Sequence, residues 1–412
     1  MSLPRSDVSE ARAADEAQAA VEGLRGTLTL FLICASILGF VTALTMIAPL
    51  LLDLSRELGV PLGQAGLLAA MMSLPWALGA PFTGLLSDRL GRRPLIVLAL
   101  AGVGASTIAA GFATSFGMLL AARFAAGVFG AFGPASVMAA VGDLYAPRRR
   151  GMAMGWLNAG FGLAAIAGVP AVGLVGGVWG WRWAFAVTGI VVLLLAVVVH
   201  VAFPSPPPTH TGVSLRQTYT EVLGVPRLGN VLSANLLERA IFNATLLYLP
   251  SFLMLNYGLS TAGVAPALAL VAIGTLVGTA FGGWLGDRFR GPRATIFVCA
   301  QLLAGGLGLV LFGVAPGLVI SVLLGALFGM TNASSRPSFL ALGSELSPRY
   351  RGALLGLLSL TNQGGTVLGT SLGGVALSFG SYSTLAVLTM CGGLGAATLA
   401  LPLTRLKLAR EA

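Results

Sequence analysis

The chain is divided into twelve apolar runs, each long enough to cross a lipid bilayer as a helix. A hydrocarbon core about 30 Å thick is spanned by about 20 helical residues. The runs lie near 28–52, 63–86, 94–112, 116–141, 152–177, 183–203, 229–256, 263–284, 294–313, 316–341, 353–378 and 383–404. This pattern predicts an all-α membrane protein with twelve transmembrane helices.

The composition supports the same class. Only 9% of the residues are charged and 56% are hydrophobic, whereas soluble domains carry about 25% charged residues. The three cysteines lie in apolar runs, which argues against a disulfide framework. His200 and His210 are isolated, and Lys407 is the only lysine. We therefore expect no metal site, no phosphate-binding loop, no cofactor and no enzymatic activity.

The basic residues predict the orientation. If the N-terminus is cytoplasmic, nineteen of the 24 basic residues lie on that side and only Arg56 and Arg182 on the other. This asymmetry follows the positive-inside rule and places both termini in the cytoplasm. The location is then the inner (plasma) membrane. The positive charge is spread over short loops next to the membrane, which argues against nucleic acid as a partner.

A proline-rich stretch between the sixth and seventh runs marks a boundary between two halves. Its prolines exclude a helix and favour a stiff linker. The expected organisation is an N-terminal segment, a six-helix bundle, a cytoplasmic linker, a second six-helix bundle and a tail, at 1–26, 27–203, 204–228, 229–404 and 405–412.

The two halves repeat each other. "GLLSDRLGRRP" at 84–94 matches "GWLGDRFRGPR" at 283–293, and "PRRRGMAMG" at 147–155 matches "PRYRGALLG" at 348–356. The shifts are 199 and 201 residues. A parallel repeat of six spans predicts two similar bundles, with a substrate bound between them near the membrane midplane.

These motifs resemble those of the major facilitator superfamily. "GLLSDRLGRR" is similar to its signature between the second and third spans, and "LLAARFAAGVFGA" at 119–131 to its fourth-span signature. "GFGLAAIAGVPAVGLVGG" at 160–177 resembles the fifth span of the twelve-span drug and metabolite proton antiporters. The resemblance implies a monomeric secondary transporter that moves a small molecule by alternating access, with proton-coupled efflux. The alternatives are a transporter for uptake or exchange of an organic anion, and an uncoupled passive facilitator.

The loop signature predicts a conformational latch. An acid at the membrane edge can accept hydrogen bonds from the free amides of a helix N-terminus, and by resemblance that helix is the eleventh span, near Gly352. The alternative is that the arginines only hold the loop in the cytoplasm. The predicted latch residues are Asp88, Arg89, Arg92, Arg93 and Asp143.

Four charged residues lie inside spans: Arg123, Glu238, Arg239 and Arg336. Each would cost about 2.5–3.5 kcal/mol at the bilayer centre if unpaired. In the resembled fold their spans, the fourth, seventh and tenth, line the central cavity. Adjacent helical residues point about 100° apart, so Glu238 and Arg239 need not pair. Glu238 and Arg336 are within reach, unless Arg336 extends to the cytoplasm.

Polar side chains on the fifth, seventh, tenth and eleventh spans complete the candidate substrate cavity. Each of the amide side chains in this set can equally form a hydrogen bond between helices instead of a contact with substrate. The predicted cavity residues are Arg123, Asn158, Asn235, Arg239, Asn243, Asn332, Arg336, Asn362 and Gln363.

Glu238 is the only carboxylate well inside a span, so it is the candidate proton-coupling residue. Burial favours the protonated form of a carboxyl group, whereas a nearby arginine favours the ionised form. Such a site can change its protonation state when the bundles move. The alternative is a static ion pair that stabilises the second bundle.

The topology yields a first prediction. Single cysteines placed in 257–262 should react with a membrane-impermeant thiol reagent added outside intact cells, because this loop is expected to lie outside. Cysteines placed in 204–212 should react only after the membrane is permeabilised. The opposite labelling pattern would refute the orientation.

Overall fold

The computed structural model describes residues 26–205, 220–288, 293–346 and 351–405. The first half forms a helix over residues 26–45, followed by α2 (Ile47–Glu57), α3 (Leu62–Ala65), α4 (Leu67–Leu90), α5 (Arg92–Gly111), α6 (Phe116–Gly130), α7 (Gly133–Leu144), α8 (Pro147–Leu163), a π-helical turn (Ala164–Gly168), α9 (Val169–Trp179) and α10 (Trp181–Ala202). The second half forms α12 (Leu228–Tyr257), α13 (Ala265–Arg288), α14 (Arg293–Val314), α15 (Leu318–Leu346), α16 (Arg351–Phe379) and α17 (Tyr382–Ala400). No strand occurs in these ranges. Most of the predicted segments 1–26 and 405–412, and part of the linker 204–228, lie outside the described residues.

The predicted spans agree with these helices. Eleven helical segments in the described ranges are long and apolar enough to cross a membrane, from Gly26–Glu57 to Tyr382–Thr404. The remaining predicted span, 353–378, coincides with α16, a helix of 29 residues that is not among the eleven. The fold is therefore the all-α membrane fold expected from the hydropathy pattern.

Two spans are interrupted where proline follows. The first span breaks at Met46, three residues before Pro49, and the fifth has its π-helical turn at Ala164–Gly168, just before Pro170. Proline has no N–H to donate to the preceding turn, so the helix kinks or widens there. The two breaks face each other, because a Cβ at Gly168 would overlap with the hydroxyl of Thr42 on the first span.

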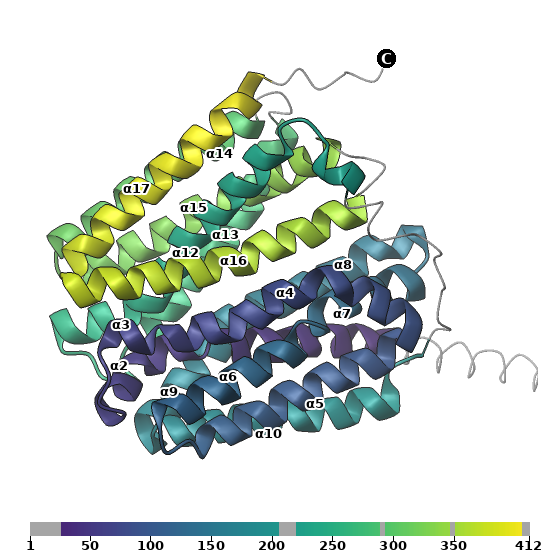
Figure 1. The fold of residues 1–412 in the computed structure, drawn as a ribbon, viewed down its shortest axis with the longest axis horizontal. Helices are drawn as coiled ribbons and strands as arrows, with labels where there is room; N and C mark the ends of the chain where they lie inside the picture. Colours follow the sequence, from purple (N-terminus) through teal and green to yellow (C-terminus); the bar gives the residue numbers. More distant parts are fainter. Residues whose placement is uncertain (1–25, 206–219, 289–292, 347–350, 406–412) are drawn as a thin grey trace, which may run out of the picture.

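The helices form two bundles with the same internal pairings, which is the expected outcome of the sequence repeat. In the first half, α4 packs on α6 and α5 packs on α10. In the second half, the corresponding helices pair in the same way, α13 on α15 and α14 on α17. Figure 1 shows the two groups side by side, with α4 and α16 at their boundary.

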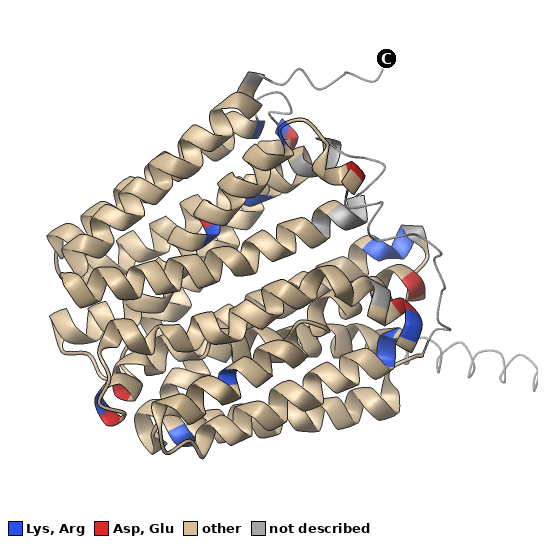
Figure 2. Cartoon of the chain, in the orientation of Figure 1, with Lys and Arg blue, Asp and Glu red and all other residues tan. Residues whose placement is uncertain are grey.

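The bundles are joined mainly at one end. There, a Cβ at Gly63 would overlap with the carbonyl oxygen of Gly374, and the Thr261 hydroxyl donates to Asp53 Oδ2 at 2.5 Å. We call this the Asp53 end; it includes Arg182, which is predicted to lie outside. Figure 2 shows more charged residues at the opposite end, which we call the arginine-rich end.

The apolar cores differ between the two ends. At the Asp53 end, one cluster contains residues of both bundles, such as Leu50 and Tyr248. Towards the arginine-rich end, the first bundle has its own cluster, which includes Ile96, and the second bundle has another, which includes Phe297. The bundles therefore share a core at one end and keep separate cores at the other.

Glycines allow close packing within the second bundle. Gly274, Gly278 and Gly282 recur every four residues along α13, and a Cβ at any of them would overlap with a backbone carbonyl of α15. Small residues at this spacing let two helix backbones approach.

This packing yields a second prediction. Gly282→Ala should lower the thermal stability of the purified protein, because the new methyl overlaps with the Ser334 carbonyl; overpacking costs about 1–3 kcal/mol. Gly283→Ala is the matched control, since a Cβ there meets no atom within 4 Å. Equal melting temperatures for the two variants would contradict the packing.

Candidate functional site

A charged cluster lies on α12 and α15, about 15 Å from the start of α12. Glu238 is only 1% exposed. Its Oε2 accepts from Arg239 Nε at 2.6 Å and from Arg336 Nη1 at 3.3 Å, and its Oε1 accepts from Arg239 Nη2. Two cations thus share one buried carboxylate.

The ion pair of Glu238 with Arg336 agrees with the sequence prediction. The sequence left open whether Glu238 and Arg239 pair, and the structure shows that they do. The two Cα–Cβ bonds point about 100° apart, but both side chains are long enough to bend back until their charged groups meet. Desolvation at this depth favours that conformation, because an unpaired charge in hydrocarbon is costly.

Arg239 also connects the cluster to the tenth span and to an aromatic pair. Its Nη2 donates to Asn332 Oδ1 at 2.9 Å, and its guanidinium carbon lies 4.5 Å from the ring centroid of Phe242. Phe242 in turn stacks on Phe328 of α15. The cation is therefore held by a carboxylate, an amide and a π face.

The cluster has more donors than acceptors. Asn332 is fully buried, and its Nδ2 has no hydrogen-bond partner among the described residues. Exchanging its amide O and N would turn the NH₂ group towards the Arg239 donor, so the observed orientation is the favourable one. A buried donor without a partner costs about 1–3 kcal/mol. With two arginines and one glutamate, the site has donors left for a further hydrogen-bond acceptor.

The other predicted amides separate into two groups. Asn235 is buried and donates to Thr361 Oγ1 at 2.7 Å and to Asn362 Oδ1 at 3.1 Å, so it links α12 to α16. Asn243 donates to the Arg239 carbonyl of its own helix at 2.8 Å. Gln363 and Asn158 make no side-chain hydrogen bond within the described ranges, and the structure does not bring them into the cluster.

Arg123 lies in the first bundle and is fully buried. Its guanidinium donates to the backbone carbonyls of Ala43 at 2.8 Å, Leu44 at 3.0 Å and Leu68 at 3.4 Å. Ala43 and Leu44 directly precede the break in the first span, where helix carbonyls lose their usual partners. In this state Arg123 supports the broken helix, and its donors face the backbone instead of an open substrate site.

Some residues of the predicted latch contact one another. Arg92 binds Asp88 Oδ1 at 2.6 Å, Asp143 Oδ2 at 2.7 Å and Ser87 Oγ at 2.8 Å. It therefore ties the junction of α4 and α5 to the end of α7. Arg89 is exposed, and the side chain of Arg93 forms part of a pocket on α5. The predicted contact of Asp88 near Gly352 borders residues 347–350, which are outside the described part, and stays a prediction.

Two polar groups at the Asp53 end escaped the sequence reasoning. Thr261, which binds Asp53, lies in a short loop without a recognisable motif. Glu57 accepts from Trp181 Nε1 at 2.6 Å and from Arg182, whose guanidinium carbon lies 4.2 Å from the Trp181 ring centroid. The sequence "GWRWAF" at 180–185, which contains Trp181 and Arg182, was the available signal for this second group.

No group of three or more His, Cys, Asp or Glu side chains within the described ranges could hold a metal ion.

Comparison with known proteins gives a family. The model of the Major Facilitator Superfamily matches residues 31–370. The chain is 28% identical over 334 residues to an uncharacterized MFS-type transporter, YceJ, of Bacillus subtilis, covering 80% of this chain and 84% of that protein. It is 28% identical over 282 residues to a chloramphenicol resistance protein of Streptomyces lividans, covering 68% and 71%.

A solved structure has the same fold. It is a bacterial homologue of the human lysosomal transporter Spinster, in an inward-facing and unoccupied conformation. It superposes with a TM-score of 0.73 over 92% of this chain and 95% of that one, at 20% sequence identity.

The Arg92 contacts yield a third prediction. Arg92→Gln should lower thermal stability by about 1–2 kcal/mol, allowing for partial solvent screening, because it removes charged hydrogen bonds to two carboxylates. Its transport rate should fall as well. Arg89→Gln is the control and should stay within about 0.5 kcal/mol of the parent. If both variants behave alike, the arginines serve only the membrane topology.

Proposed function

The chain belongs to the major facilitator superfamily, and from this premise we propose that it exports a small organic molecule in exchange for protons, with Glu238 as the proton-binding residue. The family makes it a membrane transporter that works by alternating access, and not an enzyme. Proton coupling, the direction and the role of Glu238 are the proposed part.

The observation that carries the proposal is the carboxylate buried between two arginines of different spans. Deprotonated Glu238 accepts hydrogen bonds from Arg239 on α12 and Arg336 on α15. A proton on this carboxylate removes the charge that holds both cations, so the two helices lose a shared ion pair. Protonation thereby changes the energy of the bundle by an amount that depends on the positions of the helices, as coupling requires.

Alternating access is supported by the unequal ends of the molecule. If the arginine-rich end faces the cytoplasm, the core shared by both bundles closes the protein towards the outside. The two separate cores then lie on the cytoplasmic side. Glu238 lies between the shared core and the separate cores. At this depth, a change between the outward-facing and inward-facing states would expose a site to one side of the membrane or to the other.

Efflux as the direction is supported by the kinship with the Streptomyces lividans chloramphenicol resistance protein. In an antiporter, the proton and the substrate must exclude each other from the site. A substrate that interacts with the ionised Glu238 meets this requirement, because protonation removes its partner.

A second candidate is uptake or exchange of an organic anion, and it is favoured by one specific observation, the unpartnered Nδ2 of Asn332. An anion would bind this amide together with Arg239 and Arg336. Glu238 competes with the anion for these donors, so its protonation would strengthen anion binding. Proton and anion would then travel together.

The fourth prediction separates these mechanisms in proteoliposomes, with radiolabelled chloramphenicol as the first probe for efflux and a panel of organic anions for the alternative. Glu238→Gln should keep substrate exchange across the membrane but lose accumulation driven by a pH gradient, because the site can no longer change its charge. Acidification should weaken binding to the parent protein under antiport and strengthen it for a co-transported anion.

Asp53→Asn is the matched control, since it neutralises a carboxylate at the Asp53 end and leaves Glu238 intact. A stable Glu238→Gln variant that still concentrates substrate with the gradient would refute the proposed proton site. A variant with a lowered melting temperature and no exchange would make Glu238 a structural ion pair. A parent protein insensitive to the gradient would be a passive facilitator.

A further inference from the structure

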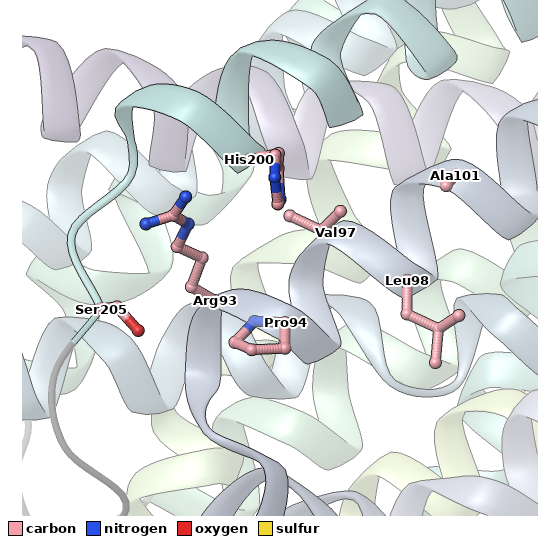
Figure 3. A pocket seen from close by; sticks show the side chains of 7 residues that line it. All are labelled: Arg93, Pro94, Val97, Leu98, Ala101, His200 and Ser205. Carbon is pink, nitrogen blue, oxygen red and sulfur yellow. The ribbon is translucent and has the colours of Figure 1, made fainter.

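A cavity of about 450 Å³ opens beside α5 and α10, outside the charged cluster. Figure 3 shows Arg93 and Ser205 on one side of it, Leu98 and Ala101 on the other, and His200 and Val97 between them. Its lining residues are Arg93, Pro94, Val97, Leu98, Ala101, His200 and Ser205.

The cavity lies at the edge of the membrane. Arg93 is the second residue of α5, and His200 lies in the last turn of the antiparallel α10. Both helices belong to the candidate membrane spans Arg92–Gly111 and Trp181–Ala202. The polar side chains are therefore level with the lipid headgroups.

The apolar wall extends from this edge towards the membrane interior. Pro94, Val97, Leu98 and Ala101 are spaced by three and four residues, so they form one stripe along α5. The distance from Arg93 to Ala101 is about 12 Å along the helix. Leu98 is 46% exposed, which leaves it open to the hydrocarbon chains of the bilayer.

Among the described residues, no carboxylate forms an ion pair with Arg93. The nearby Asp88 and Asp143 both bind the neighbouring Arg92. None of the described residues that line the cavity is acidic. A cation at the headgroup level above an apolar stripe matches a molecule with an anionic head and a hydrocarbon tail. Basic pockets between spans on the cytoplasmic side bind anionic lipid headgroups in this way.

We propose that this cavity is a binding site for one anionic phospholipid, whose phosphate contacts Arg93 and His200 and whose acyl chain lies on the stripe from Pro94 to Ala101. The inference is independent of the transported substrate and of the role of Glu238. It assigns Arg93 a contact that differs from that of Arg92.

Native mass spectrometry of the purified full-length protein tests the site. Titrated phosphatidylglycerol should bind the parent protein at one site more tightly than phosphatidylcholine does. Arg93→Gln should weaken this binding about fivefold, the effect of losing one basic contact to an anionic lipid. Arg93→Lys should largely restore it. Leu98→Asn should weaken it through the acyl chain alone.

Arg148→Gln is the matched control, because Arg148 is an exposed arginine at the start of α8, outside this cavity. Unchanged phosphatidylglycerol binding by Arg93→Gln, or equal losses in both arginine variants, would overturn the proposal. Inorganic phosphate should not displace the lipid at millimolar concentration; displacement would make the site one for a free anion. Equal affinity for phosphatidylcholine would reduce it to an unselective lipid contact.

Discussion

The free-energy cost of placing charged side chains inside a hydrocarbon layer determines which side chains pair in the second bundle. Glu238 and Arg239 lie about ten residues inside the seventh span, and Arg336 lies six residues from the end of the candidate span Leu318–Leu342. An isolated charge at the bilayer centre would cost about 2.5–3.5 kcal/mol. Hydrogen bonds and ion pairs among these side chains offset this cost. The Glu238 carboxylate accepts from both guanidinium groups, and Asn332 accepts from Arg239. These contacts join α12 to α15, so the charges that need each other also fix two of the spans that enclose the candidate cavity. One positive charge remains, which is why an anionic guest is the second proposed substrate class.

The first bundle satisfies the same constraint without an acid. Arg123 is fully buried, and its donors are met by three backbone carbonyls. Two of these carbonyls, those of Ala43 and Leu44, are available because the first span breaks at Met46. An intact helix would occupy them with its own amides. The break and the arginine therefore depend on each other: the cation supplies donors that the broken helix lacks, and the broken helix supplies the acceptors that a buried cation requires.

The contrast between these two clusters explains how far the sequence could predict the site. Hydropathy predicted the spans, because the length of a span follows from the thickness of the bilayer. The pair of Glu238 with Arg336 could be anticipated from depth. The contact of Glu238 with Arg239 depends on side-chain rotamers, which helical periodicity does not contain. The partners of Arg123 are carbonyls, and every residue has one, so no residue type marks them. For Asn235, the alternatives of ligand contact and interhelical bond were both open, and burial against Thr361 and Asn362 favours the second.

The contacts that join the two bundles are separate from the ion pairs of Glu238. At the Asp53 end, the bundles meet through close backbone approach at Gly63 and Gly374 and through the hydrogen bond from Thr261 to Asp53. A glycine contact presents a smooth surface, so its separation does not require interlocked side chains to change rotamers. The ion pairs of Glu238, by contrast, lie within one bundle and join α12 to α15. A rocking motion of whole bundles would therefore break the first set and preserve the second. Coupling under the proposed mechanism therefore requires α12 and α15 to shift relative to each other as well, so that the pairing of Glu238 with Arg336, and with it the tendency of Glu238 to bind a proton, differs between the two states.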